Sequence, residues 1–451
     1  MTQTKTPLDL SVKTLGPRTF ASPLGLSTLA DDDVADYVCD ETRVLSQIEW
    51  TVGEGAVPPS PATTESFEKA GPREHIYFHP KKVTVGIVTC GGLSPGLNMV
   101  IRSLVMELHH GYGVPRILGF RYGYEGLNPQ VGRPPLELTP ELVEDCHRLG
   151  GSILGLSRGA QDAAVMVDYL VALEIDVLFT LGGDGTQRGA HALQQEIERR
   201  GLKIAVVGVP KTIDNDVAFV DQTFGFDTAV EMARTVLDGA HVEAKGARNG
   251  VGIVKLMGRD AGFIAAQATL ASGEVNVCLV PEVDFEIEGE HGLLAFLEER
   301  LRRRSHALVV VAEGCAGTVA RRLGAKGERD ASGNLRYSAD SLDVGVYLRD
   351  AIRAHFKGKG LPIGVKYIDP SYTVRSVPPI GTDGVFCDRL ARNAVHAAMA
   401  GKSDVLVGRS HGVFTHVPLS VVTGEKKTIE PDGTLWLSVL RSTGQPLFHA
   451  R

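Results

Sequence analysis

The sequence has few cysteines, and none of them stands at the spacing of a metal site or a redox pair. The six cysteines of this 451-residue chain are scattered singly, with no Cys-x-x-Cys pair among them. That arrangement argues against the usual zinc sites and against a disulfide framework. Isolated thiols are typical of a reducing compartment, so we expect a cytoplasmic protein.

Positive charge, long apolar runs and two common nucleotide-binding motifs are also missing. The formal net charge is -7, whereas a nucleic-acid surface needs clustered Lys and Arg. No apolar segment approaches the length of a membrane span, and the amino terminus lacks the apolar core of a signal peptide. Neither a Gly-x-Gly-x-x-Gly fingerprint nor a P-loop occurs, which disfavours dinucleotide oxidoreductases and P-loop kinases. We expect neither a nucleic-acid partner nor membrane association.

What the chain does contain is glycine, placed between apolar strands and helices. It has 52 glycines and 43% hydrophobic residues, enough for a large core and two domains. Buried strands are predicted at 83–89, 176–181 and 204–209, and the pattern resumes at 250–255 and 307–311, with helices between them. Such alternation predicts an α/β fold built from two doubly wound parallel-sheet domains, with ligands beyond the carboxyl ends of the strands.

The pattern divides the chain into four parts. Residues 1–80 lack strong periodicity and are interpreted as an amino-terminal extension that packs on the main body. A first α/β domain is expected over 81–225, and a second over 226–400 with part of the chain returning to the first. The remainder, 401–451, alternates like short strands and predicts a carboxyl-terminal hairpin or arm.

The turn Gly182-Gly183-Asp184-Gly185-Thr186 follows an apolar strand and precedes a helix that we expect to begin at Ala190. Its glycines let the backbone approach a ligand, and a helix amino terminus offers unpaired N–H groups to a phosphate. Asp184 would repel a phosphate unless a divalent cation lay between them, so we predict magnesium there. Taken alone, the same residues also fit an ordinary strand-to-helix turn with a capping aspartate.

A second polar segment, 210–217, reads Pro-Lys-Thr-Ile-Asp-Asn-Asp-Val and follows the strand at 204–209. Transfer of a phosphoryl group to an alcohol needs a carboxylate to accept the hydroxyl proton and a cation to offset charge on the moving group. Asp214 and Lys211 can fill these two roles. The alternative is a solvated turn whose aspartates cap the following helix.

Further polar turns also follow predicted strands or glycine loops. Two glycine-rich loops, 90–98 and 150–159, should meet the first turn at the carboxyl edge of the sheet, and the second ends in Arg158 and Gly159. Arg259 in the turn at 256–262 can fork onto a phosphate. Four more candidates come from strand ends and one later turn: Glu282 and Glu313, which can bind sugar hydroxyls or form salt bridges, and Tyr372 and Arg375. By contrast, the charges of Arg302, Arg303 and Arg304 are most simply a solvated helix face.

At this point the set of motifs resembles the phosphofructokinases. The resemblance runs in order from about Lys82 to Arg375 through these segments: GGLSPGLN, GGSILGLSRG, GGDGT, PKTIDND, GFDTA, MGRDAG, PEVDF, AEG and YTVR. It implies a kinase that phosphorylates the 1-hydroxyl of fructose 6-phosphate with magnesium, in glycolysis, in a cleft between two α/β domains. The first of these, 81–225, would bind the donor, and the second, 226–400, the sugar phosphate.

The resemblance also implies residue roles. Asp214 would accept the proton, with Lys211, Thr212 and Arg259 as further catalytic residues, and Asp184 would be the magnesium-linked residue. The donor site would be lined by Gly92, Arg158, Gly159, Gly182, Gly183, Asp184, Gly185 and Thr186. The sugar phosphate would be held by Thr212, Ile213, Asp214, Asp216, Met257, Gly258, Arg259, Glu313, Tyr372 and Arg375. Because family members often complete this site with arginines of a neighbouring subunit, a homo-oligomer, a tetramer under allosteric control, is implied.

Donor identity depends on Gly185 and Lys211. In the pyrophosphate-using branch the position of Gly185 is typically Asp, whose side chain occupies the space that a nucleotide needs. Gly185 leaves that space open. Lys211 is nevertheless typical of the pyrophosphate-type lineage. We favour ATP, since the glycine acts sterically whereas a lysine serves either donor, and the combination resembles the ATP-dependent members found in trypanosomatids and plants.

Several other interpretations compete with this one. A pyrophosphate-dependent phosphofructokinase or a sedoheptulose 7-phosphate kinase would share most of the motifs. An NAD or lipid kinase shares Gly-Gly-Asp-Gly but does not need the sugar-phosphate residues around Arg259 and Arg375. A catalytically silent regulatory subunit is disfavoured because Asp184, Lys211, Asp214 and Arg259 are all present.

Overall fold

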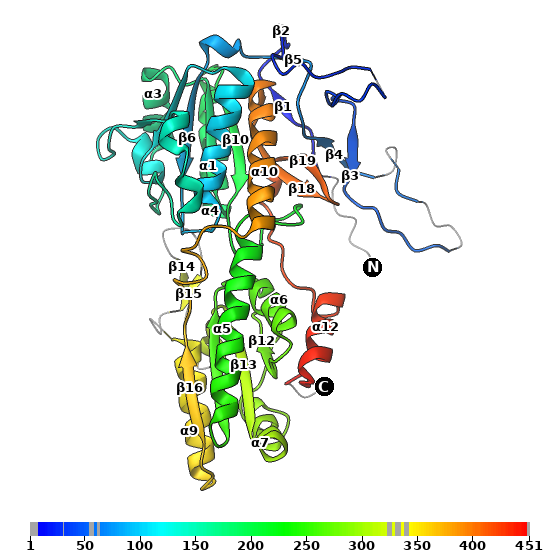
Figure 1. The fold of residues 1–451 in the computed structure, drawn as a ribbon, viewed down its shortest axis with the longest axis vertical. Coiled ribbons are helices and arrows are strands. Elements are labelled where there is room, and N and C mark those ends of the chain that lie inside the picture. The colour runs from blue at the N-terminus through cyan, green and yellow to red at the C-terminus, as the bar shows by residue number, and fades with distance from the viewer. Residues whose placement is uncertain are drawn as a thin grey trace. The chain divides into compact units, whose positions relative to one another are not determined.

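The structure is a computed structural model that describes residues 8–29, 31–53, 58–60, 64–322, 327–329, 335–337 and 342–448. The chain divides into two compact units, which Figure 1 shows as ribbons. Unit 1 consists of Met1–Thr212, Val217–Phe224 and Pro378–Lys426, and unit 2 of Ile213–Asp216, Gly225–Val377 and Lys427–Arg451. The chain therefore passes between the units five times.

Unit 1 is built on a nine-stranded sheet. Its strands, from one edge to the other, are β3 (Arg43–Leu45), β4 (Ser66–Lys69), β19 (Val413–Pro418), β18 (Val405–Ser410), β10 (Ala205–Pro210), β9 (Val177–Gly182), β6 (Thr84–Thr89), β7 (Arg116–Phe120) and β8 (Leu136–Glu137). The five strands from β18 to β7 are parallel, and the outer four pair antiparallel. The parallel centre confirms the α/β prediction.

Helices cover both faces of this sheet. Successive residues of β10 show why, because their side chains point to opposite faces of the sheet: Val207 packs into one buried cluster and Val206 into another. The first face carries α1 (Leu97–Met106) and α10 (Gly381–Met399), which pack together, and the second carries α3 (Ala163–Ala172), α4 (Asp184–Arg199) and α11 (Leu419–Val422). A central sheet buried on both sides is what the continuous apolar runs of its strands require.

The segment before β6 is tied to the sheet by a buried ionic cluster. Glu68 of β4 accepts from Arg73 at 2.8 Å, from Lys402 at 3.0 Å and is 3.0 Å from His416 Nδ1 of β19. Burial favours the neutral acid, but the hydrogen bond and charge of His416 and the charge of Lys402 outweigh it, so the pKa of Glu68 is well below its ordinary value. This cluster joins the early chain to the returning carboxyl-terminal strands.

The carboxyl-terminal part differs from the expected arm of short strands. The predicted hairpin is present as β18 and β19, but it lies within the nine-stranded sheet. Beyond it the chain forms α12 (Thr434–Thr443), a helix that packs in unit 2 against α6 (Phe263–Ser272). Trp436 and Val439, three residues apart, are the buried face of α12, which is a helical spacing that the alternation of the surrounding residues concealed.

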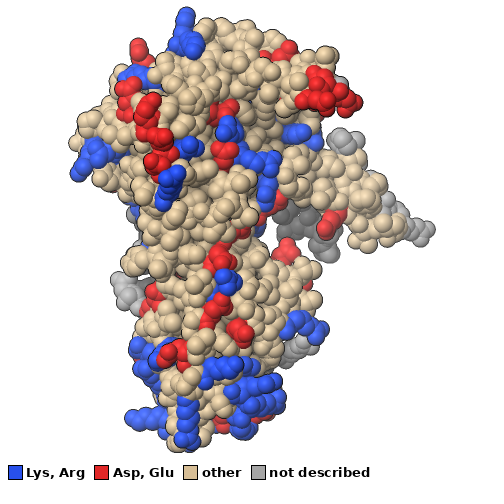
Figure 2. Space-filling view, in the orientation of Figure 1, with Lys and Arg blue, Asp and Glu red and all other residues tan. Residues whose placement is uncertain are grey.

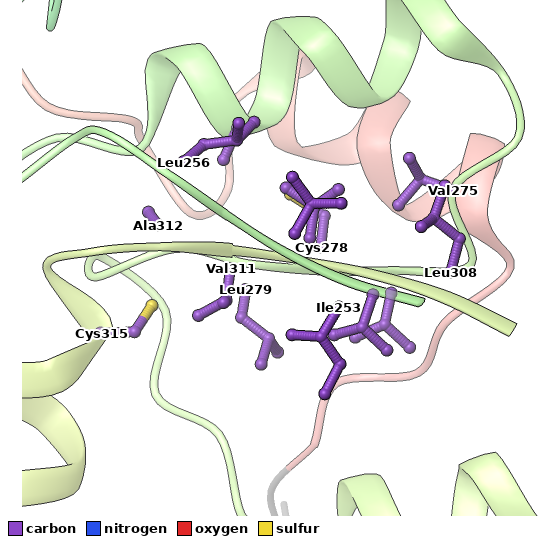
Figure 3. Close-up of a cluster of buried hydrophobic side chains, with 14 of the residues drawn as sticks. Ile253, Leu256, Val275, Cys278, Leu279, Leu308, Val311, Ala312 and Cys315 are labelled. Atoms are coloured by element: carbon purple, nitrogen blue, oxygen red, sulfur yellow. The ribbon is translucent and has the colours of Figure 1, made fainter. Parts of the chain in front are cut away.

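Unit 2 has a four-stranded, wholly parallel sheet. Its strands are β12 (Val277–Leu279), β13 (His306–Ala312), β11 (Gly250–Leu256) and β16 (Gly364–Ile368), and its further helices are α5 (Phe226–Gly246), α7 (Leu293–Arg304) and α9 (Val344–Gly358). Figure 3 shows part of the core around this sheet, where Ile253, Leu256 and Cys278 lie among buried aliphatic side chains. The parallel order places the ends of β11, β13 and β16 at one edge.

The basic end of α7 is solvated, as the sequence predicts. Arg302 and Arg303 are 66% and 72% exposed and pair with Glu299 one turn earlier. Figure 2 shows Lys and Arg side chains gathered at the end of unit 2 where α7 and α9 lie. In the described parts of the chain, no helix combines the length and apolar character needed to cross a bilayer.

The remaining strands and helices are short. The strands are β1 (Lys13–Thr14), β2 (Phe20–Ala21), β5 (His75–Ile76), β14 (Gly327–Arg329), β15 (Leu335–Tyr337) and β17 (Lys402–Ser403), and the helices are α2 (Pro140–Val143) and α8 (Cys315–Arg322). Four 3-10 or π segments lie at Pro80–Lys82, Glu107–Tyr112, Gly123–Leu127 and Cys146–Arg148. The expected helix at Thr139 is thus only one turn, capped by the Thr139 side chain.

Candidate active site

Three glycine loops of unit 1 come together at the carboxyl ends of β6 and β9. The Cys90 amide donates to Leu181 at 3.0 Å, and the Gly91 amide donates to Ser157 at 2.9 Å. Thr89, the last residue of β6, donates its hydroxyl to Gly155 at 2.8 Å. This is the convergence that the order of strands predicts for a doubly wound sheet.

The turn after β9 is shorter than the sequence suggested. Helix α4 begins at Asp184, and not at Ala190 as predicted, with Gly183 in the N-cap position. Gly185 and Gly189 weakened the helical pattern in the sequence, but a Cβ at position 189 would lie 2.5 Å from the Tyr124 ring, so packing explains that glycine. Asp184 and Gly185 therefore stand in the first turn of a 16-residue helix, where N–H groups lack partners within the helix.

The space over Gly185 is open. A Cβ built there would approach only the Arg188 Nη2 atom, at 3.9 Å. At Gly182, by contrast, a Cβ would lie 2.1 Å from the Thr186 hydroxyl, so any side chain at that position would displace the helix start. The turn can therefore hold a group close to its backbone at Gly185, while Gly182 is required for the close approach of strand and helix.

Lys211 binds this turn from the neighbouring strand. Its amide donates to Gly182 at 3.0 Å, and its Nζ atom donates to the Gly92 carbonyl at 2.6 Å. The side chain is 5% exposed. A buried ammonium thus lies between two of the glycine loops, where it can meet a negatively charged group.

Asp184 lies between two cations. Arg188, one turn further along α4, donates to Oδ2 of Asp184, and Lys426 Nζ is 3.8 Å from the same oxygen. Among the described residues no cluster of three or more His, Cys, Asp or Glu could enclose a metal ion. Magnesium is commonly held by one or two carboxylates together with phosphate oxygens, so a single carboxylate here fits a phosphate-bound magnesium ion.

Two other residues of the predicted donor site end the third loop. Arg158 is exposed, and Gly159 adopts a φ of 117°, which favours glycine, with open space where a Cβ would stand. Thr212, the last residue of unit 1 before the chain crosses, accepts a hydrogen bond from the Thr223 hydroxyl at 2.6 Å through its carbonyl. This hydrogen bond joins the backbone at Thr212 to Thr223.

Asp214 lies in unit 2 among charged neighbours. Desolvation and the nearby carboxylates of Asp216 and Glu313 raise its pKa to about 8, against the opposing charge and backbone N–H of Arg259. An aspartate that titrates near neutral pH can exchange a proton during catalysis. Between the two aspartates Asn215 has a φ of 55°, a left-handed conformation that Asn tolerates better than most residues.

The turns after β11 and β13 are packed against one another. The Gly314 amide donates to Gly258 at 3.0 Å, and a Cβ at position 314 would lie 2.0 Å from the Arg259 carbonyl oxygen. Gly258 itself has a φ of 128°. Burial raises the pKa of Glu313, although the charge of Arg259 opposes the shift. Met257, half-buried, precedes this pair of turns.

The loop after β16 carries a tyrosine and an arginine. The Arg375 guanidinium lies 5.4 Å from the centre of the Tyr372 ring, and Tyr372 is 77% exposed. Within the described residues the buried Arg375 Nε atom has no hydrogen-bond partner, which fits an anion ligand. The start of the loop is held by Lys255, which pairs with Asp343 at 2.7 Å and Asp369 at 2.8 Å.

Glu282, a candidate for sugar hydroxyls, uses one of its two carboxylate oxygens in structural hydrogen bonds. Its Oε1 accepts from the Gly262 amide at 2.9 Å and from the Ile429 amide at 3.0 Å. These bonds join α6 to the returning carboxyl-terminal segment.

Three residues near the predicted sites were missed in the sequence: Asn215, Lys255 and Lys426. Only Asn215 left a signal, since Asn between two aspartates suggests a turn.

Comparison with known proteins gives the family of the chain. The family model described as Phosphofructokinase matches residues 84–398. The chain is 48% identical over 446 residues to the ATP-dependent 6-phosphofructokinase of Borreliella burgdorferi, covering 98% of this chain and 97% of that protein. It is 48% identical over 444 residues to the enzyme of the same name from Amycolatopsis methanolica, covering 97% and 95%.

The fold comparison is consistent at lower identity. The crystal structure of the pyrophosphate-dependent phosphofructokinase from Marinobacter aquaeolei aligns with a TM-score of 0.65 and 20% identity, over 80% of this chain and 91% of that one. At this identity the likeness concerns the fold alone. On the match of the family model and the long, closely similar relatives, the chain belongs to the phosphofructokinase family.

Proposed function

We propose that this protein transfers the terminal phosphoryl group of ATP to the 1-hydroxyl of fructose 6-phosphate, giving fructose 1,6-bisphosphate and ADP as a step of glycolysis. The observation that carries the proposal is Asp214, whose pKa is raised to about 8 beside Arg259 and Glu313. The names of the long relatives support the same activity. Each residue role below is part of this proposal.

On the acceptor side, Asp214 takes the proton of the 1-hydroxyl as the oxygen attacks the phosphorus atom. Thr212, Ile213 and Asp216 lie beside it in sequence and border the sugar. The 6-phosphate is bound by Arg375 with Tyr372, while Met257, Gly258, Arg259 and Glu313 line the sugar side through the paired turns. Arg259 also holds Asp214 through its charge and backbone N–H, which keeps the carboxylate form accessible.

On the donor side, the loops that meet at β6 and β9 hold the phosphates of ATP. Gly92, Gly182, Gly183, Gly185 and Thr186 present backbone and hydroxyl groups, and Arg158 and Gly159 close the third loop. Lys211 stabilises the charge that develops on the transferred group. Asp184 would hold Mg²⁺, which supplies positive charge to the donor phosphates when bound.

ATP is favoured over pyrophosphate because the space over Gly185 is open. A carboxylate side chain there would fill the volume next to the helix start, where the phosphate nearest the nucleoside must pass. Lys211 is compatible with either donor, since it contacts the loops and not the nucleoside side of the turn. Lysine 211 therefore does not decide between the two donors.

The proposal is tested by comparing turnover with Mg·ATP and with magnesium pyrophosphate, each with fructose 6-phosphate and with sedoheptulose 7-phosphate. We expect fructose 1,6-bisphosphate with ATP and a higher kcat/KM for fructose 6-phosphate than for the longer sugar. Turnover with pyrophosphate alone would establish the pyrophosphate-dependent alternative. No turnover with either donor would favour a silent regulatory subunit.

We further propose a homo-oligomer, a tetramer by family resemblance, in the cytoplasm. The exposed ring of Tyr372 next to Arg375 supports it, because a sugar phosphate bound there would need cover from another chain. Light scattering on the purified protein should give a mass of about four chains. A monomer with full activity would contradict this assembly.

A further inference from the structure

Lys426 approaches the proposed magnesium carboxylate from a distant part of the sequence. Its Nζ atom lies 3.8 Å from Oδ2 of Asp184, the oxygen that also accepts from Arg188. The lysine side chain is 33% exposed, so its ammonium is partly open to solvent. None of the motifs that indicate a kinase includes this residue.

The backbone of Lys426 is fixed by two structural features. It forms an antiparallel bridge with Val217, the residue immediately after the Thr212–Asp216 segment. It also follows α11, whose residues Leu419 and Val422 are buried in the cluster that α4 shares. The backbone is therefore held from both directions, and the Lys426 side chain starts beside the first turn of α4, where it can reach a ligand of Asp184.

The charges around Asp184 favour a change of partner for the Lys426 ammonium when a phosphate donor binds. Without a donor, Arg188 and Lys426 both offset the Asp184 carboxylate. When a phosphate-bound divalent cation engages that carboxylate, a nearby ammonium is repelled by the metal and attracted by the phosphate oxygens. Lysine suits this movement, because it is a point charge on a flexible stem. Arg188 contacts the same oxygen from one turn further along the helix that carries Asp184.

We propose that Lys426 is a donor-binding residue: it pairs with Asp184 in the unloaded protein and moves to the phosphates when Mg·ATP binds. The inference rests on the proposed function, because it assumes a phosphate donor at the first turn of α4. It assigns the segment around 419–426 a part in donor binding, in addition to its place beside the sheet. The expected consequence is a weaker affinity for Mg·ATP when the ammonium is removed, with the sugar site unaffected.

The test is Lys426→Met, measured by calorimetric titration with Mg·ATP and by separate KM values for ATP and fructose 6-phosphate. We expect about tenfold weaker binding of Mg·ATP, the scale for losing one partly exposed charge contact to phosphate, and an unchanged KM for fructose 6-phosphate. Lys426→Arg should recover most of the affinity. The matched control is Lys427→Met, whose ammonium lies 5.4 Å from the Phe263 ring, and it should bind Mg·ATP like the unchanged protein.

Equal Mg·ATP affinity in Lys426→Met and the unchanged protein would overturn the inference, as would an equal rise in both KM values. If the methionine variant does not fold, Lys426→Gln, which keeps the stem and a polar end, is measured and judged in the same way. Failure of the unchanged protein to bind Mg·ATP would contradict the proposed function itself, so the two failures are distinguishable.

Discussion

Replacing Asp214 by Asn should strongly reduce turnover and at the same time stabilise unit 2. The folded protein raises the pKa of this carboxyl to about 8, whereas an aspartate in an unfolded chain titrates near 3.8. Between these values the folded state keeps a proton that the unfolded state has lost. The free energy of unfolding therefore falls as pH rises from about 4 to 8, and it falls no further from this cause above pH 8. Asn carries no titrating proton, so the variant escapes this loss.

The size of the effect can be bounded from the structure. One pKa unit corresponds to about 1.4 kcal/mol, so the full shift sets a ceiling of roughly 5–6 kcal/mol at pH 8. Asp214 is half-buried and shares its shift with Asp216 and Glu313, and both facts reduce the value that applies to one side chain. We expect a gain of about 2 kcal/mol at pH 8, and a gain of less than about 1 kcal/mol at pH 5.

The assay is thermal and urea unfolding of both proteins at pH 5 and pH 8, combined with turnover at saturating substrates. We expect kcat to fall by roughly two to four orders of magnitude, the usual scale for losing a general base. The matched control is Asp238→Asn, an aspartate that is 42% exposed on α5 of the same unit and pairs with Arg234. It should show neither the loss of turnover nor a gain that grows with pH. A variant at position 214 that is destabilised at pH 8 would refute the electrostatic reasoning.

Four further outcomes are expected. Gly185→Asp should fold normally, because the space is open, and should raise the KM for ATP at least about tenfold; an unchanged KM would show that the turn does not face the nucleotide. Glu68→Gln should lower the free energy of unfolding by roughly 3 kcal/mol at pH 7 in denaturant titrations. Because its pKa is lowered in the fold, that difference should shrink as pH falls below about 4.5, and a constant difference would argue against an ionised Glu68. Arg375→Ala should raise the KM for fructose 6-phosphate about 30-fold or more with little effect on ATP, and equal effects on both would remove it from the sugar-phosphate site. In Gly314→Ala the new Cβ would lie 2.0 Å from the Arg259 carbonyl oxygen, so the KM for fructose 6-phosphate should rise. An unchanged KM would show that the paired turns after β11 and β13 do not shape the sugar site.

The sequence predicts the parallel centre of the fold well. Apolar runs such as the one that ends at Leu181 are buried on both faces, and a strand of that kind has few alternatives once a glycine turn and a helix follow it. The convergence of the loops at Gly91, Gly155 and Gly182 follows from the same rule, since parallel strands end at one edge. Local patterns therefore sufficed for the parallel strands and the meeting of their loops, although not for every helix boundary.

Features that depend on distant segments could not be predicted in this way. The expected arm after residue 401 supplies strands to the large sheet, where Glu68, Lys402 and His416 meet in one buried cluster, and no local pattern records such a pairing. Helix α4 starts six residues before the predicted position, and its Gly189, a residue that weakens helices, is there for a tertiary reason, since it packs on the Tyr124 ring. Lys426 was missed for a related reason, since its approach to Asp184 spans most of the chain.

The most direct test of the account follows the γ-phosphate of labelled ATP with the unchanged protein and with Asp214→Asn, at pH 8 in the presence of magnesium and fructose 6-phosphate. The account predicts label on the 1-hydroxyl of the sugar with the unchanged protein, and almost none with the variant although it remains folded. Label transfer at similar rates by both proteins would contradict the role of Asp214, and no transfer by the unchanged protein would contradict the proposed kinase activity.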